Sequence, residues 1–202
     1  FPTAQPPQDN AFFMTWEQRA RLFSYLMVDG PLPEHFEPQE SPTKNIFNGA
    51  DKNPLARFTK DPSVQLGDPK EFPIVCTTYS LTEHWQTGTQ TRNVPWLNEL
   101  IPGNFIEISE ELAQEKGIKK GDKVHIWNRR GSIVVDAMIT IRMKPMMING
   151  VKTHVVGLPH HFSWEGMFAT GDNVNDLSPN VGDPNSFIPE FKAFLVNVEK
   201  AA

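Results

Sequence analysis

The stretch FIEISEELAQEKGIKKGDKVHIWNRRGSIVVDAMIT, residues 105–140, decides the fold. It begins as a short apolar strand, after which Ser109 caps a short helix that Gly117 ends in the left-handed conformation. A Gly-Asp turn then leads into an alternating strand over 120–128, and an Arg-Arg-Gly turn returns the chain as a long strand over 132–143. The stretch therefore predicts three strands and one short helix joined by tight turns.

Further strands flank this stretch on both sides. FPIVCTTYS (72–80) is predicted to be a buried strand, and FKAFLVNVE (191–199) a last one. Asn149-Gly150 is a hairpin signal that leads into VKTHVVGLP (151–159). About six strands and one short helix over roughly 130 residues indicate a mainly β fold, and this spacing is typical of a small closed β-barrel.

The first third of the chain has a different composition. Residues 1–73 contain eleven of the 18 prolines, and proline lacks the N–H that helices and sheets need. We therefore predict two parts, a proline-rich extended arm at 1–70 and the barrel at 71–202. One helix is expected in the arm, where a capping box at Thr15 precedes apolar residues on one helical face. The arm is either a linker or a segment that docks on another surface.

The composition excludes several classes of protein. With 202 residues, 39% hydrophobic and 21% charged, the chain is able to form a packed core and is not expected to be disordered. Its net charge of −5 disfavours nucleic acid and anionic membranes as partners. A single cysteine, Cys76, excludes an internal disulfide, a multi-cysteine zinc site and an iron–sulfur cluster of its own. No apolar run of about 18 residues is present to span a membrane. Because the chain begins with Phe1, we expect a processed or excised piece of something larger.

The stretch 105–140 resembles the core of the molybdopterin-dinucleotide-binding domain, a six-stranded double-psi β-barrel that closes the large subunit of molybdenum and tungsten oxidoreductases. Other segments are similar to the C-terminus of the formate dehydrogenase catalytic subunit, of the respiratory or periplasmic type, in the molybdopterin oxidoreductase (DMSO reductase) superfamily. These segments are TTYSLTEHWQTGTQTRN (77–93), GLPHHFSWEG (157–166), LSPNVGDPNS (177–186) and PEFKAFLVNVEKA (189–201), and GPLPEHFEPQESP (30–42) in the arm fits as well. The resemblance covers nearly the whole chain.

The resemblance implies a function that this chain performs only as part of a larger enzyme. It implies a bis-molybdopterin guanine dinucleotide carrying molybdenum or tungsten, shared with an upstream catalytic domain that oxidises formate to carbon dioxide. It also implies electron transfer to iron–sulfur clusters, a periplasmic or alternatively cytoplasmic location, and two partners: the rest of the catalytic subunit and an iron–sulfur electron-transfer subunit. The family's metal-ligating selenocysteine or cysteine and its 4Fe-4S motif have no counterpart in this sequence. We therefore expect no catalytic residue and no metal ligand here, and no formate oxidation by the chain alone.

Three loops that follow strands carry the candidate cofactor contacts. A pterin dinucleotide presents a donor-and-acceptor edge, a charged pyrophosphate and a guanine, so binding it needs short polar side chains and free backbone N–H groups on loops. The candidates are Thr78, Leu81 (through its backbone), Thr82, Glu83, His84, Thr87, His161, Trp164, Asn175, Asp176, Phe191 and Lys192. Of these, Glu83 is suited to accept two N–H groups, Asn175 to donate and accept at a pterin edge, and Lys192 to offset negative charge.

Each candidate has an ordinary structural alternative. The first loop also fits a Ser/Thr-rich surface loop, and His161 also fits a satisfied histidine at the rim of a barrel. Trp164 and Phe191 are equally suited to fill the core, and Asn175 and Lys192 also fit a plain loop or surface position. His160 and His161 are neighbours, and neighbours on a strand point to opposite faces, so we do not expect them to hold one metal ion.

Two alternatives to a formate dehydrogenase stay open. The barrel core also fits a nitrate or polysulfide reductase of the same superfamily. A free-standing double-psi barrel that acts as a non-catalytic binding module is the other alternative. Outside the candidate loops, Arg129 and Arg130 are expected to be solvated charges of a turn.

Overall fold

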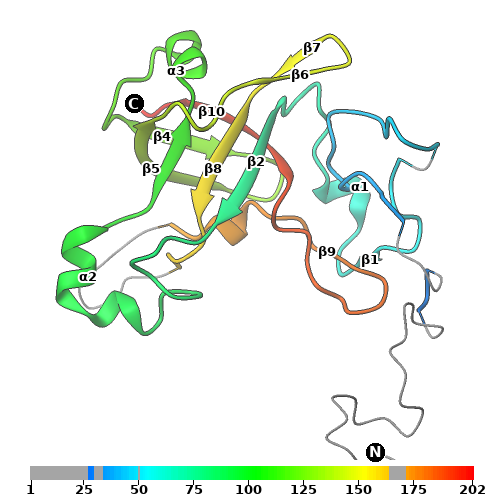
Figure 1. Ribbon diagram of the computed structural model, residues 1–202, viewed down its shortest axis with the longest axis horizontal. Helices are drawn as coiled ribbons and strands as arrows, with labels where there is room; N and C mark the ends of the chain where they lie inside the picture. Colours follow the sequence, from blue (N-terminus) through cyan, green and yellow to red (C-terminus); the bar gives the residue numbers. More distant parts are fainter. Residues whose placement is uncertain (1–26, 30–33, 50, 164–171) are drawn as a thin grey trace, which may run out of the picture. The chain divides into compact units, whose positions relative to one another are not determined.

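The computed structural model describes residues 27–29, 34–49, 51–163 and 172–202 (Figure 1). The chain divides into two compact units, residues 1–34 and 35–202, and almost all described residues lie in the second. The helix expected to begin at Thr15 lies outside the described residues. The domain boundary expected at residue 70 stays a prediction, and the second unit includes residues 35–70 together with the barrel.

Six strands of the second unit close into a barrel, which confirms the predicted fold class (Figure 1). The strands are β2 (Ile74–Tyr79), β3 (Phe105–Ile108), β4 (Lys123–Trp127), β5 (Ser132–Ile139), β8 (Val155–Pro159) and β10 (Phe194–Lys200), in the spatial order β10-β2-β8-β3-β5-β4. Two pairs, β2 with β8 and β3 with β5, are parallel, and the other four pairs are antiparallel. Every strand of the barrel therefore has two neighbours, and no edge is left open.

Alternation along the strands fills the barrel. Val124 and Ile126 of β4 are fully buried while the residues beside them are not, so the strand has one apolar face and one wetter face. Branched and aliphatic side chains from all six strands meet inside. The inward residues are Ile74, Cys76, Ile106, Ile108, Val124, Ile126, Ile133, Val135, Ala137, Val156, Leu158, Phe194, Val196 and Val198.

The predicted helix forms as α3 (Glu110–Lys116). Its cap is the one expected, since the Ser109 hydroxyl accepts a hydrogen bond from the Leu112 N–H at 3.0 Å. Gly117 ends the helix at a φ of 64°, in the left-handed region. The strand after the Arg-Arg-Gly turn is shorter than expected, because β5 ends at Ile139 and not at residue 143.

The remaining elements are short. The Asn149-Gly150 hairpin forms as predicted between β6 (Met146–Ile148) and β7 (Val151–Thr153), with φ values of 49° and 78° at its two turn residues. Sequence reasoning did not predict the short helices, which are α1 (Pro62–Gln65), α2 (Pro95–Leu100) and the 3-10 turns η1 (Thr91–Asn93) and η2 (Val174–Asp176). It also missed the small sheet in which β1 (Arg57–Phe58) pairs with β9 (Val181–Gly182). Within the described residues, no helix combines the length and the apolar character needed to cross a membrane.

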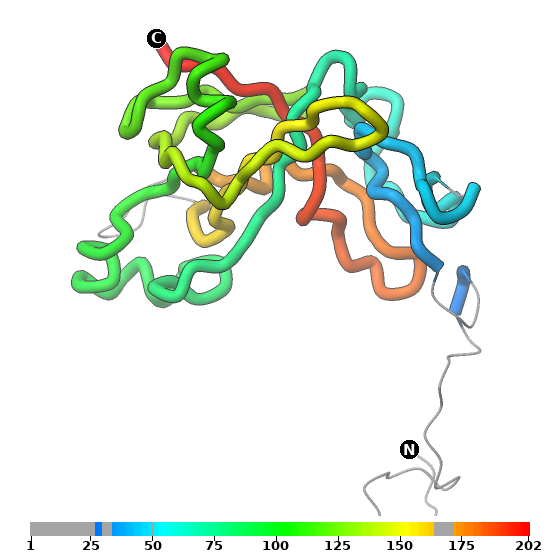
Figure 2. The backbone as a smooth tube through the Cα atoms, turned by 45° about the horizontal axis from the view of Figure 1, so that its top comes forward, coloured from blue at the N-terminus to red at the C-terminus, as the bar shows by residue number. Residues whose placement is uncertain are grey.

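Residues 35–70, which we call the strap, are tied to the barrel by a buried ion pair. Figure 2 shows the blue and cyan strap beside the orange segment around β9. Glu40 of the strap pairs with Arg130, and the two side chains are 0% and 6% exposed. The expectation that Arg130 is a solvated turn charge is therefore wrong, because sequence gave no sign that a carboxylate 90 residues away would cover it. Arg129 does lie at the surface, paired with the exposed Glu71.

Replacing Gly117 by alanine is expected to destabilise the protein by about 1 kcal/mol, because an L-residue is strained in the left-handed region. A Cβ at Gly117 would meet nothing within 4 Å, so the cost is purely conformational. Gly49 is the matched control: a Cβ there also meets nothing within 4 Å, but its φ is not positive. Urea unfolding should show a loss for Gly117→Ala and none for Gly49→Ala. Equal midpoints for the two variants would contradict the assignment.

Candidate functional site

A cleft opens where two parallel strands end. Tyr79 at the end of β2 is in register with Pro159 at the end of β8, so the loops after them leave the barrel side by side. The cleft has a volume of about 630 Å³. It is lined by Ser80, Leu81, Thr82, Glu83, His84, Trp85, Gln86, Thr91, Leu97, His160, Phe191 and Lys192.

The cleft brings together half of the twelve predicted site residues, and five of the remaining six are described elsewhere in the structure. The six in its wall are Leu81, Thr82, Glu83, His84, Phe191 and Lys192. Asn175 and Asp176 line a second cavity of about 370 Å³, whose wall also includes Arg130 and Ser178. Thr87 lies in neither wall and its hydroxyl bonds that of Thr89 at 2.8 Å. Trp164 lies outside the described residues.

Lys192 is fixed at the wall of the cleft by its contacts with β2. Its ammonium donates to the Thr78 carbonyl at 2.9 Å and lies 4.9 Å from the centroid of the Phe191 ring. In return, the buried Thr78 hydroxyl donates to the Phe191 carbonyl at 2.8 Å. Thr78 therefore acts behind the wall, and a positive charge with one of its three N–H groups in use borders the cleft.

His161 supports the loop that forms the floor of the cleft. It is fully buried, its Nε2 accepts from the Leu81 N–H at 2.7 Å, and its Nδ1–H donates to the Gln86 carbonyl at 2.5 Å. Burial lowers its pKa, which favours the neutral ring that this donor-and-acceptor pattern requires. Both ring nitrogens are engaged, so we assign His161 a positioning role, and a direct contact with a ligand stays a prediction.

His84 supports the same loop from the other side. Its Nε2–H donates to the Ile101 carbonyl at 3.1 Å, and its Nδ1 accepts from the Thr91 hydroxyl at 3.1 Å. That hydroxyl accepts in turn from the Trp85 N–H at 3.1 Å. These partners assign the tautomer, because a carbonyl only accepts. The His84 and Thr91 side chains therefore supply the hydrogen bonds of the Ile101 carbonyl and the Trp85 N–H, which a strand or helix would otherwise supply.

Tight packing closes the loop at Gly88. Its φ is 76°, and a Cβ would lie 2.2 Å from the His161 carbonyl oxygen and 2.9 Å from Nε of Arg92. The Arg92 side chain is buried beneath it and donates to the Ser163 hydroxyl at 3.3 Å. Burial also lowers the pKa of Arg92. Only glycine fits at this position. The sequence Thr87-Gly88-Thr89 did not by itself reveal this requirement.

Sequence reasoning missed His160 as a residue of the site. It was considered only as a metal ligand, whereas its ring lies in the wall of the cleft. Burial, and then the nearby charge of Lys192, lower its pKa. Its Nδ1 is buried without a hydrogen-bond partner among the described residues. A buried polar atom of this kind is uncommon and marks a place where a ligand group is able to bind.

The donor set of the cleft suits a large polar ligand with anionic and heteroaromatic parts. An ammonium, hydroxyls, a carboxylate and an imidazole line it, beside the rings of Trp85 and Phe191. Hydroxyls and cations bind phosphate, and aromatic faces stack on flat heterocycles. No group of three or more metal-ligating side chains was found among the described residues. The lining therefore offers hydrogen-bond donors and acceptors, one cation and aromatic faces within a single cleft.

The family of the chain follows from comparison with known proteins. Residues 74–195 match the family described as the molydopterin dinucleotide binding domain. The chain belongs to this family. The match begins with β2 and ends at the start of β10, so it covers most of the barrel, the whole wall of the cleft and the wall of the second cavity except Lys60.

Several curated proteins are similar to the chain over almost all of its length. It is 47% identical to formate dehydrogenase subunit alpha of Megalodesulfovibrio gigas, over 97% of this chain and 20% of that protein. It is 44% identical to the nitrate-inducible formate dehydrogenase major subunit of Escherichia coli K12, over 94% of this chain and 19% of that protein. The chain thus spans about a fifth of the length of these relatives.

A solved structure supports the fold. Acetylene hydratase from Pelobacter acetylenicus superposes with a TM-score of 0.57 over 85% of this chain and 22% of that one. The two sequences are 16% identical there, so the likeness concerns the fold alone.

The buried His161 predicts a pH dependence of stability. Its pKa is lower in the folded protein than the ordinary value of about 6.5. The unfolded chain therefore takes up the proton first as the pH falls, so this contribution is complete above about pH 6.5 and is lost as the pH falls toward the folded pKa. His161→Gln should lower stability at pH 7.5 by about 1–3 kcal/mol, because the glutamine amide does not place its oxygen and nitrogen where the two ring nitrogens lie, and at least one of the bonds to the Leu81 N–H and the Gln86 carbonyl is lost.

The pH dependence is the decisive measurement. Urea unfolding of the wild type and of His161→Gln is measured at a series of pH values between 5 and 8. The free energy of unfolding should fall less steeply with falling pH in the variant than in the wild type. An unchanged decline would mean that His161 does not carry this proton linkage.

Proposed function

We propose that the chain is the C-terminal cofactor-binding part of a molybdenum or tungsten formate dehydrogenase. In this proposal it binds bis-molybdopterin guanine dinucleotide and closes the active site, while the rest of the catalytic subunit oxidises formate to carbon dioxide. Support comes from relatives named as formate dehydrogenase alpha or major subunits, which are 40–47% identical over 94–98% of this chain.

The cleft at the end of β2 and β8 is the observation that carries the proposal. Segments 80–86 and 191–192 are more than a hundred residues apart, yet both line it. A pyranopterin with a dinucleotide tail is an elongated, polar and anionic molecule. A cleft of about 630 Å³ with a cation at its wall suits part of such a molecule.

Five residues of the cleft have defined tasks in this proposal. Lys192 offsets the negative charge of the pyrophosphate, and Glu83 accepts from a pair of N–H groups on the pterin or guanine. The Ser80 and Thr82 hydroxyls with the loop amides surround phosphate oxygens, and Phe191 stacks on a flat ring. When bound, the cofactor supplies the metal and its redox chemistry, while this chain binds, orients and excludes water.

The wider assignments are part of the same proposal. The partners we propose are the remainder of the catalytic subunit and an iron–sulfur electron-transfer subunit that receives the electrons through 4Fe-4S clusters. The location we propose is the periplasm, on the resemblance to respiratory formate dehydrogenases. The relatives named as alpha or major subunits support an assembly of several subunits.

Guanosine diphosphate, the nucleotide half of the cofactor tail, is a stable probe of the site. The 202-residue chain should bind it saturably, and Lys192→Gln should weaken binding by about fivefold to tenfold, or about 1 kcal/mol, through the loss of a phosphate partner. Raised salt should reduce the difference. Titration followed by tryptophan fluorescence gives the affinities.

Lys200 provides the matched control, since it lies at the far end of β10, the strand that begins two residues after Lys192, and pairs with Asp122. Lys200→Gln should bind the probe like the wild type. No saturable binding by the wild-type chain would argue against the proposal and for a binding module that does not use this cofactor. An equal loss in both variants would point to unspecific attraction.

A further inference from the structure

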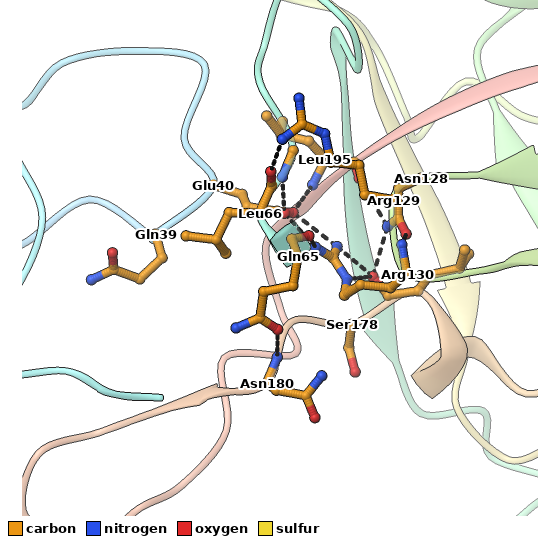
Figure 3. A network of polar contacts seen from close by, with 12 residues as sticks. Gln39, Glu40, Gln65, Leu66, Asn128, Arg129, Arg130, Ser178, Asn180 and Leu195 are labelled. Carbon is orange, nitrogen blue, oxygen red and sulfur yellow. Dashed lines mark hydrogen bonds and ion pairs between the residues drawn. The ribbon is translucent and has the colours of Figure 1, made fainter. Parts of the chain in front are cut away.

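The strap contributes one carboxylate that is saturated with hydrogen bonds. Oε1 of Glu40 accepts from Nη1 of Arg130 and from the Gly67 N–H at 2.5 Å, and Oε2 accepts from Nη2 of Arg130 at 2.9 Å and from the Leu195 N–H at 2.8 Å. Figure 3 shows these partners converging from separate parts of the chain. A carboxylate has about four acceptor sites, so Glu40 has none to spare.

Arg130 is used just as fully. Its Nε–H donates to the Leu177 carbonyl at 2.9 Å, and Nη2 donates to the same oxygen at 2.6 Å. Nη1 donates to the Gln65 carbonyl at 2.7 Å besides its bond to Glu40. The guanidinium has five N–H groups, and all five are accounted for. Although Arg130 lines the second cavity, it has no N–H left for a ligand and serves to hold other groups in place.

The groups that this pair holds adjoin the candidate cofactor contacts. Leu177 directly follows Asn175 and Asp176 of η2. Its carbonyl also accepts from Nδ2 of Asn128 at 2.8 Å, so three donors fix this one oxygen. Leu195 lies three residues after Lys192, at the start of β10. One buried ion pair therefore holds the residues that closely follow each set of candidate contacts, Leu177 after Asp176 and Leu195 after Lys192.

A second set of contacts also joins the strap to the segment between η2 and Lys192. Gln65 of the strap accepts from the Asn180 N–H at 3.0 Å through its side chain, and β1 pairs with β9 beyond it. At the other end, the Gln39 N–H donates to the Glu190 carboxylate at 2.9 Å. Residues on both sides of Glu40 thus contact the loop that runs from η2 to Lys192.

We propose that Glu40 is a positioning residue of the cofactor site, acting through Arg130 on the turn that carries Asn175 and Asp176, and through Leu195 on the segment that carries Lys192. The inference rests on the proposed function and deepens it, because it makes the proline-rich strap a part of the binding site. Without Glu40 the Arg130 charge is buried and unpaired, and a guanidinium that turns toward water withdraws both donors from Leu177.

The neighbouring pair Arg129–Glu71 is a natural control. It joins the same turn to the strap, with Nε and Nη2 of Arg129 at 3.1 and 2.7 Å from the Glu71 carboxylate. Both side chains are exposed, at 37% and 52%. Among the described residues, the hydrogen bonds of these two side chains go to each other and to the Leu66 carbonyl of the strap, so the side-chain pair ties the strap without touching η2 or the segment that carries Lys192.

The experiment compares three variants of the 202-residue chain with the wild type: Glu40→Gln, Glu71→Gln, and the double variant Glu40→Met with Arg130→Met. Hydrogen exchange reports on the turn amides of Asp176, Leu177 and Ser178, which bond within the turn. Thermal unfolding reports on stability, and titration with guanosine diphosphate reports on the site. The double variant separates the two roles, because replacing both charges by apolar side chains often preserves stability.

Glu40→Gln is expected to lower the thermal midpoint by about 10 °C. It should also speed exchange of the turn amides and weaken binding of the probe by about tenfold or more, as when a residue that orients ligating groups is lost. The double variant should unfold within a few degrees of the wild type, yet keep the fast exchange and the weak binding. Glu71→Gln should match the wild type in all three measurements.

Two results would overturn the inference. One is a double variant, or Glu40→Gln, with wild-type exchange and wild-type binding. The other is a Glu71→Gln variant with the same losses as Glu40→Gln, since any tie of the strap would then suffice. If the wild-type chain fails to bind the probe while exchange responds as expected, the proposed function is what fails, and with it the cofactor role of Glu40.

Discussion

The parallel pairing of β2 with β8 is the constraint on which the rest of the structure depends. These strands are about 80 residues apart in the chain, yet their registered ends send two irregular loops out at the same place. Antiparallel neighbours would have sent them to opposite ends of the barrel. The contact of His161 with the loop after β2 follows from this strand direction, and Lys192 reaches the same place because β10 runs antiparallel to β2.

Irregular backbone near a core must find hydrogen-bond partners outside a helix or sheet. In this protein the imidazole of His161 supplies two of them, accepting from the Leu81 N–H and donating to the Gln86 carbonyl, and the Thr91 hydroxyl supplies a third by accepting from the Trp85 N–H. Burial lowers the pKa of His161 and so favours the form that is able both to donate and to accept. A loop held in this way keeps its amides and hydroxyls at fixed positions, and a binding site for a rigid cofactor needs such preorganisation.

Buried ion pairs are costly to desolvate, so their presence calls for a physical reason. The Glu40–Arg130 pair joins four segments that are far apart in the chain, and it does so with every donor and acceptor of the two side chains satisfied. An apolar contact of similar size has no direction, whereas a fork of N–H groups on a single carbonyl fixes both distance and angle. The pair therefore fixes the relative positions of these segments more than it adds to the free energy of unfolding.

The sequence by itself determined the local elements of the barrel. Ser109, Gly117 and Asn149-Gly150 fix the helix ends and the hairpin through backbone preferences that act over a few residues, and alternation marked the strands. Only the tertiary structure decided which polar groups meet. Three features depend on pairings across some 75 to 155 residues. Glu40 covers Arg130, both ring nitrogens of His161 bond to one loop, and Asn175 and Lys192 border different cavities. Such pairings leave no periodic trace in the sequence, because only the closing of the barrel makes the partners neighbours.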